Sequence, residues 1–259
     1  MNKIPVNNFC STENLRTWLE ISKSAIDNNI AQYKKIIGNK ILAPVIKSNA
    51  YGHGIIEVAK ICEQNKDVDW MCVANADEAL LLRKNGIKKD ILILAYIGQS
   101  AEELIKENVS LMAYDLAEIA SLNAIGKKLN KKVNLHIKID TGLSRLGVTP
   151  DEAVNFIKQA QNFDFITIQG IWTHFTEPAL EQREFTNLQA TRFKNVIKDL
   201  EKENIKIPLI HSSNSAGILT VDSDCDNFYR PGVSFYGYWP SQYIKNITKQ
   251  NYPDIKLIP

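Results

Sequence analysis

The hydrophobic positions of this chain fall into short runs that alternate with longer amphipathic stretches. Nine short runs, many of them rich in β-branched and aromatic residues, predict strands at 17–22, 41–47, 70–74, 91–96, 110–114, 133–140, 166–172, 208–212 and 233–238. Between them, apolar residues recur with a helical period, which predicts helices near 23–37, 54–65, 76–85, 101–108, 115–129, 150–161, 182–204 and 213–220. The chain therefore reads as a series of strand–helix units.

Repeated strand–helix units with buried, non-alternating strands are typical of a parallel sheet covered by helices. Eight or nine such units in 259 residues favour a closed α/β barrel of the (β/α)8 TIM type over an open doubly wound sheet. No Gly-rich linker, GxGxxG fingerprint or GxxxxGK[ST] loop interrupts the pattern. We predict one barrel domain over residues 1–241. Beyond Ser241 the pattern loosens, and we expect residues 242–259 to be a linker or the start of a truncated C-terminal domain.

Composition narrows the class of protein further. The 31 basic and 29 acidic residues leave a net charge of +2, which argues against nucleic acid or an anionic membrane as a partner. Four scattered cysteines without a CxxC pair predict neither a metal site nor a disulfide framework: Cys10, Cys62, Cys72 and Cys225. The start MNKIPVNNF lacks the apolar core of a signal peptide, and the apolar run 91–98 is too short to cross a bilayer. We expect a cytoplasmic protein.

Lys47 ends the apolar run ILAPVIK and opens the glycine-punctuated turn SNAYGHG. A lone lysine at a strand end usually extends into solvent. The alternative is an amine held in the dry mouth of a barrel, where it can react. Reactive groups of barrels collect at the C-terminal ends of the strands, so this position suits the second interpretation as well.

Four other stretches at predicted strand ends carry polar groups. Arg145 lies in KIDTGLSRLGV, His174 in GIWTHF and Arg230 in YRPGVSFYG. The stretch HSSNSAG places hydroxyls and an amide before a predicted helix, which suits a phosphate, and barrels often bind phosphate in the loops after their last strands. Each feature alone has an ordinary interpretation as a surface ion pair, a packed histidine or a helix cap.

Together these groups share one chemistry. A lysine amine, a phosphate cradle, a flat histidine and arginine donors describe a site for pyridoxal 5′-phosphate. Imine formation requires the neutral amine, which a dry strand end near other cations favours.

The same stretches resemble the motifs of alanine racemases. ILAPVIKSNAYGHG is similar to the cofactor-lysine signature of that family, and KIDTGLSRLGV, THF, HSSNSAG and RPGVSFYGYWPS are similar to its later motifs, in the same order. The resemblance runs from about Leu15 to Ser241. It implies a (β/α)8 barrel that binds pyridoxal 5′-phosphate and an enzyme that interconverts L- and D-alanine for cell-wall precursors.

The resemblance also implies residue roles at the lysine and phosphate ends of the site. Lys47 would carry the cofactor through an imine and act as one of two proton-transfer bases. Tyr51 and Ser215 would contact the phosphate, with Asn214 beside them. Backbone groups near Gly232–Val233 would add further contacts.

Further implied roles concern the ring and the substrate. Arg145 would bind the phenolic oxygen of the cofactor or the substrate carboxylate, braced by Lys138, a position that is carbamylated in some members. His174 would pack against the pyridine ring. Arg230 would donate to the ring nitrogen, with His211 behind it. Because arginine stays protonated, this donor keeps the ring a weak electron sink.

The chain departs from the family pattern in three places. Leu143 replaces a usual methionine, which is a mild apolar exchange, and TEPALEQREF follows THF where small and acidic residues are common. The family's barrel is followed by a β-rich domain that gives a catalytic tyrosine to the partner subunit of a homodimer, and this sequence stops before it. We therefore expect the chain to bind pyridoxal 5′-phosphate but to racemise alanine poorly on its own.

Other interpretations remain open. A single-domain barrel that binds and buffers pyridoxal phosphate would suit the short chain, although its motifs around the lysine would differ. A decarboxylase barrel acting on diamino acids would need a Gly-rich phosphate loop that is missing here. A structural barrel without cofactor would require the motifs to coincide by chance. The substrate within the racemase group, alanine or another small amino acid such as serine, also stays open.

Overall fold

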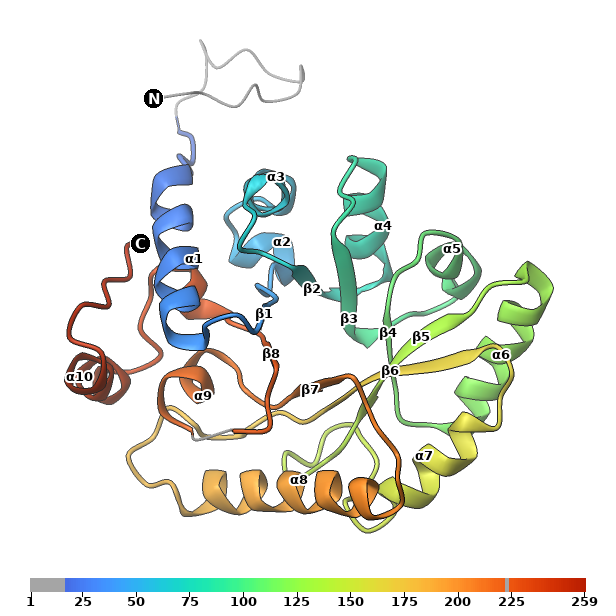
Figure 1. Ribbon diagram of the computed structural model, residues 1–259. Coiled ribbons are helices and arrows are strands. Elements are labelled where there is room, and N and C mark those ends of the chain that lie inside the picture. Colours follow the sequence, from blue (N-terminus) through green and yellow to red (C-terminus); the bar gives the residue numbers. More distant parts are fainter. Residues whose placement is uncertain (1–16, 222–223) are drawn as a thin grey trace.

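The structure is a computed structural model that describes residues 17–221 and 224–259. Within these residues eight short strands surround a common axis, and helices cover the outside (Figure 1). In chain order the strands are β1 (Ile41–Leu42), β2 (Trp70–Asn75), β3 (Asp90–Tyr96), β4 (Leu111–Ala113), β5 (Val133–Lys138), β6 (Ile166–Trp172), β7 (Leu209–His211) and β8 (Phe228–Tyr229). The predicted (β/α)8 fold is confirmed.

Pairing passes from strand to strand around the whole barrel. β2 pairs with β3, and β4 to β7 form one four-stranded ladder, with every pairing parallel. Isolated parallel bridges join the β1 segment to β2 at Val45–Cys72 and β3 to the start of β4 at Leu92–Ser110, and a backbone hydrogen bond links β7 to the residue before β8. β1 pairs with β8, where Ile41 lies beside Phe228, and the Asn227 N–H donates to the Ile210 carbonyl at 3.0 Å. Closure therefore brings residues from the two ends of the chain together.

The helices are α1 (Lys23–Ile37), α2 (Lys47–Tyr51), α3 (Ile55–Gln64), α4 (Ala76–Lys84), α5 (Ala101–Lys106), α6 (Leu116–Leu129), α7 (Ala153–Gln161), α8 (Glu184–Lys202), α9 (Ser215–Thr220), the 3₁₀ helix η2 (Val233–Tyr236) and α10 (Gln242–Asn251). Local chemistry starts several of them. The side chains of Ser22, Asn75, Asp115 and Asn214 accept hydrogen bonds from backbone N–H groups in the first turns of α1, α4, α6 and α9. The eight predicted helices are all present, with ends that differ by a few residues.

Two predicted strands are wrong. Residues 17–22 form no strand, because β1 and β8 pair with each other and leave no barrel position for them, and Trp18 remains 67% exposed. Residues 233–238 are not a strand either. The 3₁₀ helix η2 occupies them and ends at Gly237 with φ of 87°, while the eighth strand lies just before, at Phe228–Tyr229. A short apolar run does not distinguish a strand from a buried helical turn.

The predicted strand at 41–47 is shorter than expected. β1 ends at Leu42, and Lys47 begins α2 instead of closing the strand. The buried segment between them still follows the barrel wall through the bridge at Val45.

Residues after Ser241 form α10, which packs against α9, and an extended tail that lies along α1 (Figure 1). The side-chain amide of Asn29, on α1, forms two hydrogen bonds with the backbone of Ile258 in this tail. It donates to the Ile258 carbonyl at 2.7 Å and accepts from the Ile258 N–H at 2.8 Å. The same amide donates to the carbonyl of Phe235 in η2 at 3.1 Å, so α1 ties the tail to the barrel end.

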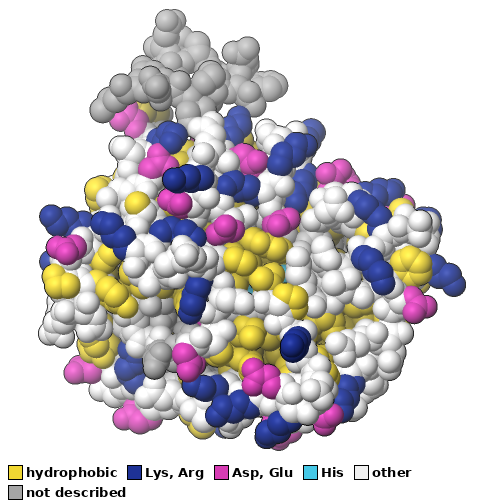
Figure 2. All heavy atoms as spheres, in the orientation of Figure 1, with side chains coloured by type: hydrophobic (Ala, Val, Ile, Leu, Met, Phe, Trp, Pro, Cys, Tyr) yellow, Lys and Arg dark blue, Asp and Glu magenta, His cyan; other side chains and the backbone are white. Residues whose placement is uncertain are grey.

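Charged side chains of both signs lie around the periphery of the visible face, and apolar side chains gather in its middle (Figure 2). No helix of the described residues is long and apolar enough to span a membrane. Cys62, Cys72 and Cys225 carry free thiols. Cys10 and the opening segment MNKIPVNNF, on which the predictions about disulfides and targeting partly rest, lie outside the described residues.

Candidate active site

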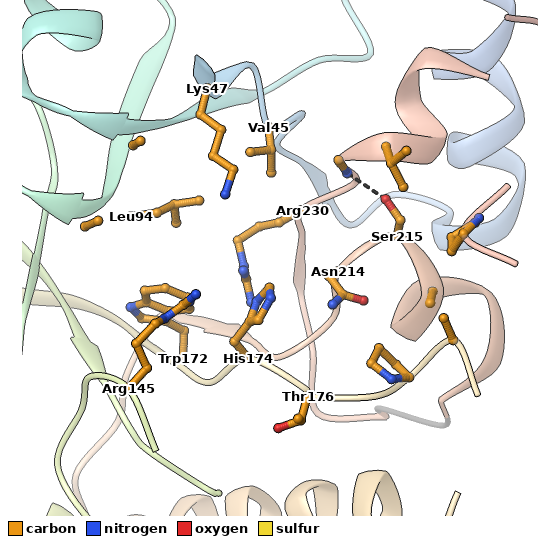
Figure 3. Close-up of a pocket in the computed structure, with 18 of the residues that line it drawn as sticks. Val45, Lys47, Leu94, Arg145, Trp172, His174, Thr176, Asn214, Ser215 and Arg230 are labelled. Carbon is orange, nitrogen blue, oxygen red and sulfur yellow. Dashed lines mark hydrogen bonds between the residues drawn. The ribbon is translucent and has the colours of Figure 1, made fainter. Parts of the chain in front are cut away.

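A cavity of about 570 Å³ opens at the end of the barrel where the motif loops meet. Nine of the predicted site residues line it, namely Lys47, Tyr51, Arg145, His174, Asn214, Ser215, Arg230, Gly232 and Val233. Lys47 and Arg230 follow the neighbouring strands β1 and β8 and extend toward the same space, and His174 lies beside Arg230 (Figure 3). Lys138 and His211, which were expected to support Arg145 and Arg230, are buried and do not line the cavity.

The backbone after Lys47 is unusual, because four successive residues without a glycine have a left-handed conformation. Residues 48–51 have φ angles between 53° and 54°. Such a turn costs about 1–2 kcal/mol per residue in L-amino acids. Glu78 supports it by accepting the N–H of Ser48, and Asn49 supports it by accepting the N–H of Ile55 at 2.9 Å. The turn keeps the half-buried Lys47 at the mouth and returns Tyr51 to the same cavity.

One end of the cavity is built from hydroxyl and backbone N–H groups. The Ser215 hydroxyl accepts the N–H of Gly232 at 2.8 Å and that of Ser234 at 3.3 Å. A Cβ at Gly232 would lie 2.8 Å from the Tyr51 hydroxyl, so a side chain at this position would displace the end of Tyr51. Behind them the buried Tyr33 hydroxyl, from α1, shares a hydrogen bond with the Ser234 hydroxyl. This end of the cavity presents the hydroxyls of Tyr51 and Ser215, and the two N–H groups are bound to Ser215.

Asn214 has two functions in the structure. Its side-chain oxygen accepts the N–H of Gly217 at 3.1 Å and caps α9, as the ordinary interpretation of HSSNSAG predicted. The residue also lines the cavity.

Arg230 is the buried cation of the cavity floor, with 2% of its surface exposed. Its Nη2 donates to the carbonyls of Thr173 at 2.8 Å and Ser212 at 3.2 Å, whereas its Nε has no hydrogen-bond partner among the described residues. The guanidinium carbon lies 4.7 Å from the centre of the Trp172 ring. Burial lowers the pKa of Arg230 to about 10, so the group stays charged at neutral pH.

Lys138 is a second buried cation and is 1% exposed. Its Nζ lies 4.5 Å from the centre of the Trp172 ring and has no hydrogen-bond partner among the described residues. Burial, followed by the positive charges of Arg145, Arg230 and Lys47, lowers the pKa of Lys138 to about 8. The amine therefore lacks an anion that would complete its surroundings.

The histidines of the site are neutral at physiological pH. Burial and then the charge of Arg230 hold the pKa of His174 and of His211 well below the usual range. His211 stacks parallel to Trp172 and shares a hydrogen bond of 2.8 Å with the buried His136. Gly170 makes room for this pair, because a Cβ there would lie 2.3 Å from Nδ1 of His136.

Several functional groups escaped the sequence analysis. Trp172 lies close to both buried cations, and Leu94, Thr176 and Ala216 line the cavity walls. The place of Trp172 as the sixth strand's last residue was a usable signal, because barrel sites collect at strand ends.

Fold and site together define a class. The protein is a (β/α)8 barrel whose mouth combines a lysine amine, a hydroxyl-lined cradle and buried cationic donors. Comparison with known proteins identifies the family, since residues 21–240 match the model of the alanine racemase N-terminal domain. The chain belongs to this family, whose members use pyridoxal 5′-phosphate.

Similar proteins include the alanine racemase of Methanococcus maripaludis, which is 40% identical over 232 residues, covering 88% of this chain and 61% of that protein. An alanine racemase structure from Clostridium difficile 630 in complex with cycloserine is 33% identical with a TM-score of 0.85, over 91% of this chain and 64% of that one. The Bacillus anthracis enzyme with bound L-Ala-P is 27% identical with a TM-score of 0.80, over 92% and 60% of the two chains. The chain thus spans about three fifths of the curated relatives it matches.

Proposed function

We propose that this chain is the cofactor-binding barrel of an amino-acid racemase that interconverts L- and D-alanine. Residues 1–241 form the barrel in this proposal, and residues 242–259 form the segment that follows it. One observation carries the proposal. The Lys47 amine and the buried Arg230, whose Nε has no hydrogen-bond partner among the described residues, line one cavity whose far end presents the hydroxyls of Tyr51 and Ser215.

The residues present fit pyridoxal 5′-phosphate. Its phosphate would be held by Tyr51, Ser215 and the backbone around Gly232, with Asn214 and Val233 at the edge. These groups meet at Gly232, where an added Cβ would displace the Tyr51 hydroxyl. Its pyridine nitrogen would accept from Arg230, which satisfies the unpartnered Nε. Lys47 would bind it covalently.

When bound, this cofactor supplies a conjugated ring that delocalises the electron pair left by removal of the substrate α-proton. The chain's own residues then determine the outcome. Lys47 Nζ takes or returns the α-proton on one face of the substrate. Arg230 stays protonated and donates, so it discourages protonation of the ring nitrogen and limits side reactions. The neutral His174 packs beside the ring without adding charge.

The substrate carboxylate would be bound by Arg145, which lines the cavity at the loop after β5. We propose that Lys138 braces this arginine as a carbamate. The neutral amine attacks carbon dioxide, a nitrogen–carbon bond forms, and one proton leaves to solvent. The product carries a negative charge among Arg145, Arg230 and Lys47, whose positive charges already lower the pKa of Lys138.

Racemisation needs a base on each face of the substrate. Among the described residues that line the cavity, Lys47 supplies the amine and Tyr51 the phenol, and Tyr51 lies beside Gly232 at the phosphate end. We propose that the second base is the tyrosine of a C-terminal β domain in a homodimer partner, as the resemblance implies. The 259-residue chain by itself would then bind the cofactor and racemise alanine poorly.

The first test uses the purified chain mixed with pyridoxal 5′-phosphate. The visible spectrum is recorded, the sample is reduced with borohydride, and the labelled peptide is mapped. We expect the label on Lys47, loss of the label in Lys47→Ala, and no loss in Lys88→Ala, which changes an exposed lysine outside the cavity. Label spread over surface lysines would contradict the proposal.

The second test asks whether the isolated chain supplies one or both of the proton-transfer bases. Alanine of each configuration is incubated with the loaded chain in deuterium oxide, and α-deuterium and configuration are followed by nuclear magnetic resonance and chiral chromatography. Because Lys47 serves one face, we expect α-proton exchange in one enantiomer only, with its configuration kept. Rapid racemisation by the isolated chain would contradict the proposed need for an external base. Binding without any exchange would favour a barrel that only stores the cofactor.

A further inference from the structure

Asp226 is a buried carboxylate that neither the motifs nor the cavity lining include. It lies two residues before β8 and is 1% exposed. Both of its oxygens accept hydrogen bonds from two neighbouring serines. The N–H of Ser212 donates at 3.0 and 3.1 Å and its hydroxyl at 2.8 Å, while the N–H and hydroxyl of Ser213 donate at 3.1 and 2.9 Å. None of the ion pairs within the described residues includes this carboxylate.

The same serines connect Asp226 with Arg230. The Ser212 carbonyl accepts from Arg230 Nη2 at 3.2 Å, and the Ser213 carbonyl accepts the backbone N–H of Arg230 at 3.3 Å. Ser212 therefore gives its N–H to the buried anion and its carbonyl to the buried cation. One residue joins the two charges without direct contact between them.

Burial makes each of these charges costly unless an opposite charge or hydrogen bonds compensate. Arg230 has no carboxylate at ion-pair distance among the described residues, and its surroundings include the further cations Lys138 and Arg145. Two groups raise the pKa of Arg230, the Cys72 thiol by the larger amount and Asp226 by the smaller. Burial raises the pKa of Cys72 to about 12, so this thiol stays protonated at neutral pH and leaves Asp226 as the acid that can balance the charge of Arg230. Burial raises the pKa of Asp226, and the serine hydrogen bonds and Arg230 oppose this shift.

We propose that Asp226 is the counter-ion of Arg230 and a positioning residue for the pyridine side of the cofactor site. Through Ser212 and Ser213 it holds the guanidinium against the Thr173 and Ser212 carbonyls, so that Nε keeps its place at the cavity floor. The inference rests on the proposed function only for the identity of the ligand. The pairing of the two charges is a property of the chain without cofactor.

The first experiment measures this pairing without any cofactor. Urea unfolding is compared for the chain, Asp226→Asn, Arg230→Met and the double variant. We expect Asp226→Asn to raise the unfolding equilibrium constant about 100-fold in the parent chain. In the Arg230→Met background the same substitution should raise this constant only about tenfold. In the Arg230→Lys background, where the charge remains, the cost should stay high. Additive effects would overturn the proposal.

Asp224→Asn is the matched control. This carboxylate lies on the same loop but is exposed and paired with Lys194 at 2.8 Å, so its loss should change unfolding little and should not couple to Arg230. If Asp226→Asn does not fold, recovery of folding in the double variant supports the charge pairing. Failure of the double variant to fold would overturn it, because the carboxylate would then act only as a clamp for the serines.

The second experiment tests positioning with three probes, namely pyridoxal 5′-phosphate, pyridoxal and inorganic phosphate. We expect Asp226→Asn to weaken both pyridoxal compounds by a similar factor of about ten and to leave phosphate affinity unchanged. Loss of phosphate affinity with pyridoxal unaffected would overturn the proposed role, because Asp226 would then shape the Ser215 end instead. If the parent chain bound none of the probes, the proposed function would be wrong. The urea unfolding experiment, which uses no cofactor, would still decide whether Asp226 and Arg230 are paired.

Discussion

Replacement of Lys138 by methionine is the clearest test of the site's electrostatics. The amine lies 4.5 Å from the centre of the Trp172 ring, is 1% exposed and has no hydrogen-bond partner among the described residues. Methionine keeps the length and the apolar contacts of the side chain and removes the charge. We therefore expect Lys138→Met to stabilise the chain at pH 7 in buffer free of carbon dioxide.

The magnitude follows from the pKa of the amine. Burial, with Arg145, Arg230 and Lys47, lowers the pKa of Lys138 from its ordinary 10.5 to about 8. At about 1.4 kcal/mol for each tenfold change in proton affinity, this corresponds to about 3 kcal/mol of lost stability. Because the folded value lies below the unfolded value, the full penalty acts below pH 8. It diminishes as the pH rises from 8, where the folded chain releases the proton, to 10.5, where both states are neutral.

Urea unfolding at pH 7.0 to 9.5 under nitrogen measures this effect. The advantage of Lys138→Met should be about 3 kcal/mol at pH 7 and should shrink by about 1.4 kcal/mol per pH unit once the pH exceeds 8. Addition of bicarbonate should stabilise the parent chain by converting the amine to a carbamate, and should leave Lys138→Met unchanged. Lys88→Met, at an exposed position, controls for the general effect of removing a lysine.

Two results would refute the reasoning. The first is a loss of stability in Lys138→Met at pH 7 without carbon dioxide, which would mean that the ammonium is satisfied in the folded state. The second is a stability difference that stays constant from pH 7.0 to 9.5. Either result would also remove the basis for the proposed carbamate.

Three further substitutions test other parts of the site. Gly232→Ala places a methyl group 2.8 Å from the Tyr51 hydroxyl, so titration should show about tenfold weaker binding of pyridoxal 5′-phosphate and unchanged binding of pyridoxal; equal losses would contradict the phosphate assignment. Ser48→Gly relieves a φ of 54°, and urea unfolding should show a gain of about 0.5–1 kcal/mol, whereas any loss would mean that the left-handed turn is not strained. Gly170→Ala directs a methyl group at His136, 2.3 Å from Nδ1, and thermal and urea unfolding should show a loss of about 1–3 kcal/mol; an unchanged midpoint would show that the histidine pair can move freely.

The elements of the barrel were predictable because its strands are buried on both faces and its helices on one. Continuous apolar runs and helical periodicity report those two kinds of burial directly. The segment 233–238 shows the limit of this reasoning. Phe235 and Tyr236 are buried as expected, but in a 3₁₀ helix, and Val233 and Tyr238 are exposed, because an apolar run alone does not specify the backbone.

The site was predictable as a set of motifs and not as a geometry. Lys47, His174 and Arg230 were recognised from their places at the ends of predicted strands and from a family resemblance, and all three line one cavity. Neither the left-handed turn that follows Lys47 nor the closeness of two buried cations to Trp172 could be read from the pattern. Asp226 gave no local signal either, because its role depends on partners that precede it by 13 and 14 residues.

The sequence by itself determined the helices and the first seven strands, because these depend on the pattern of neighbours along the chain, but it misplaced the eighth strand. The tertiary structure alone decided distances and charges. Closure of the barrel places β1 beside β8 and so brings the lysine of an early loop to the arginine of a late one. Burial then sets the protonation of the grouped cations, and burial is a property of the packed barrel rather than of any single segment.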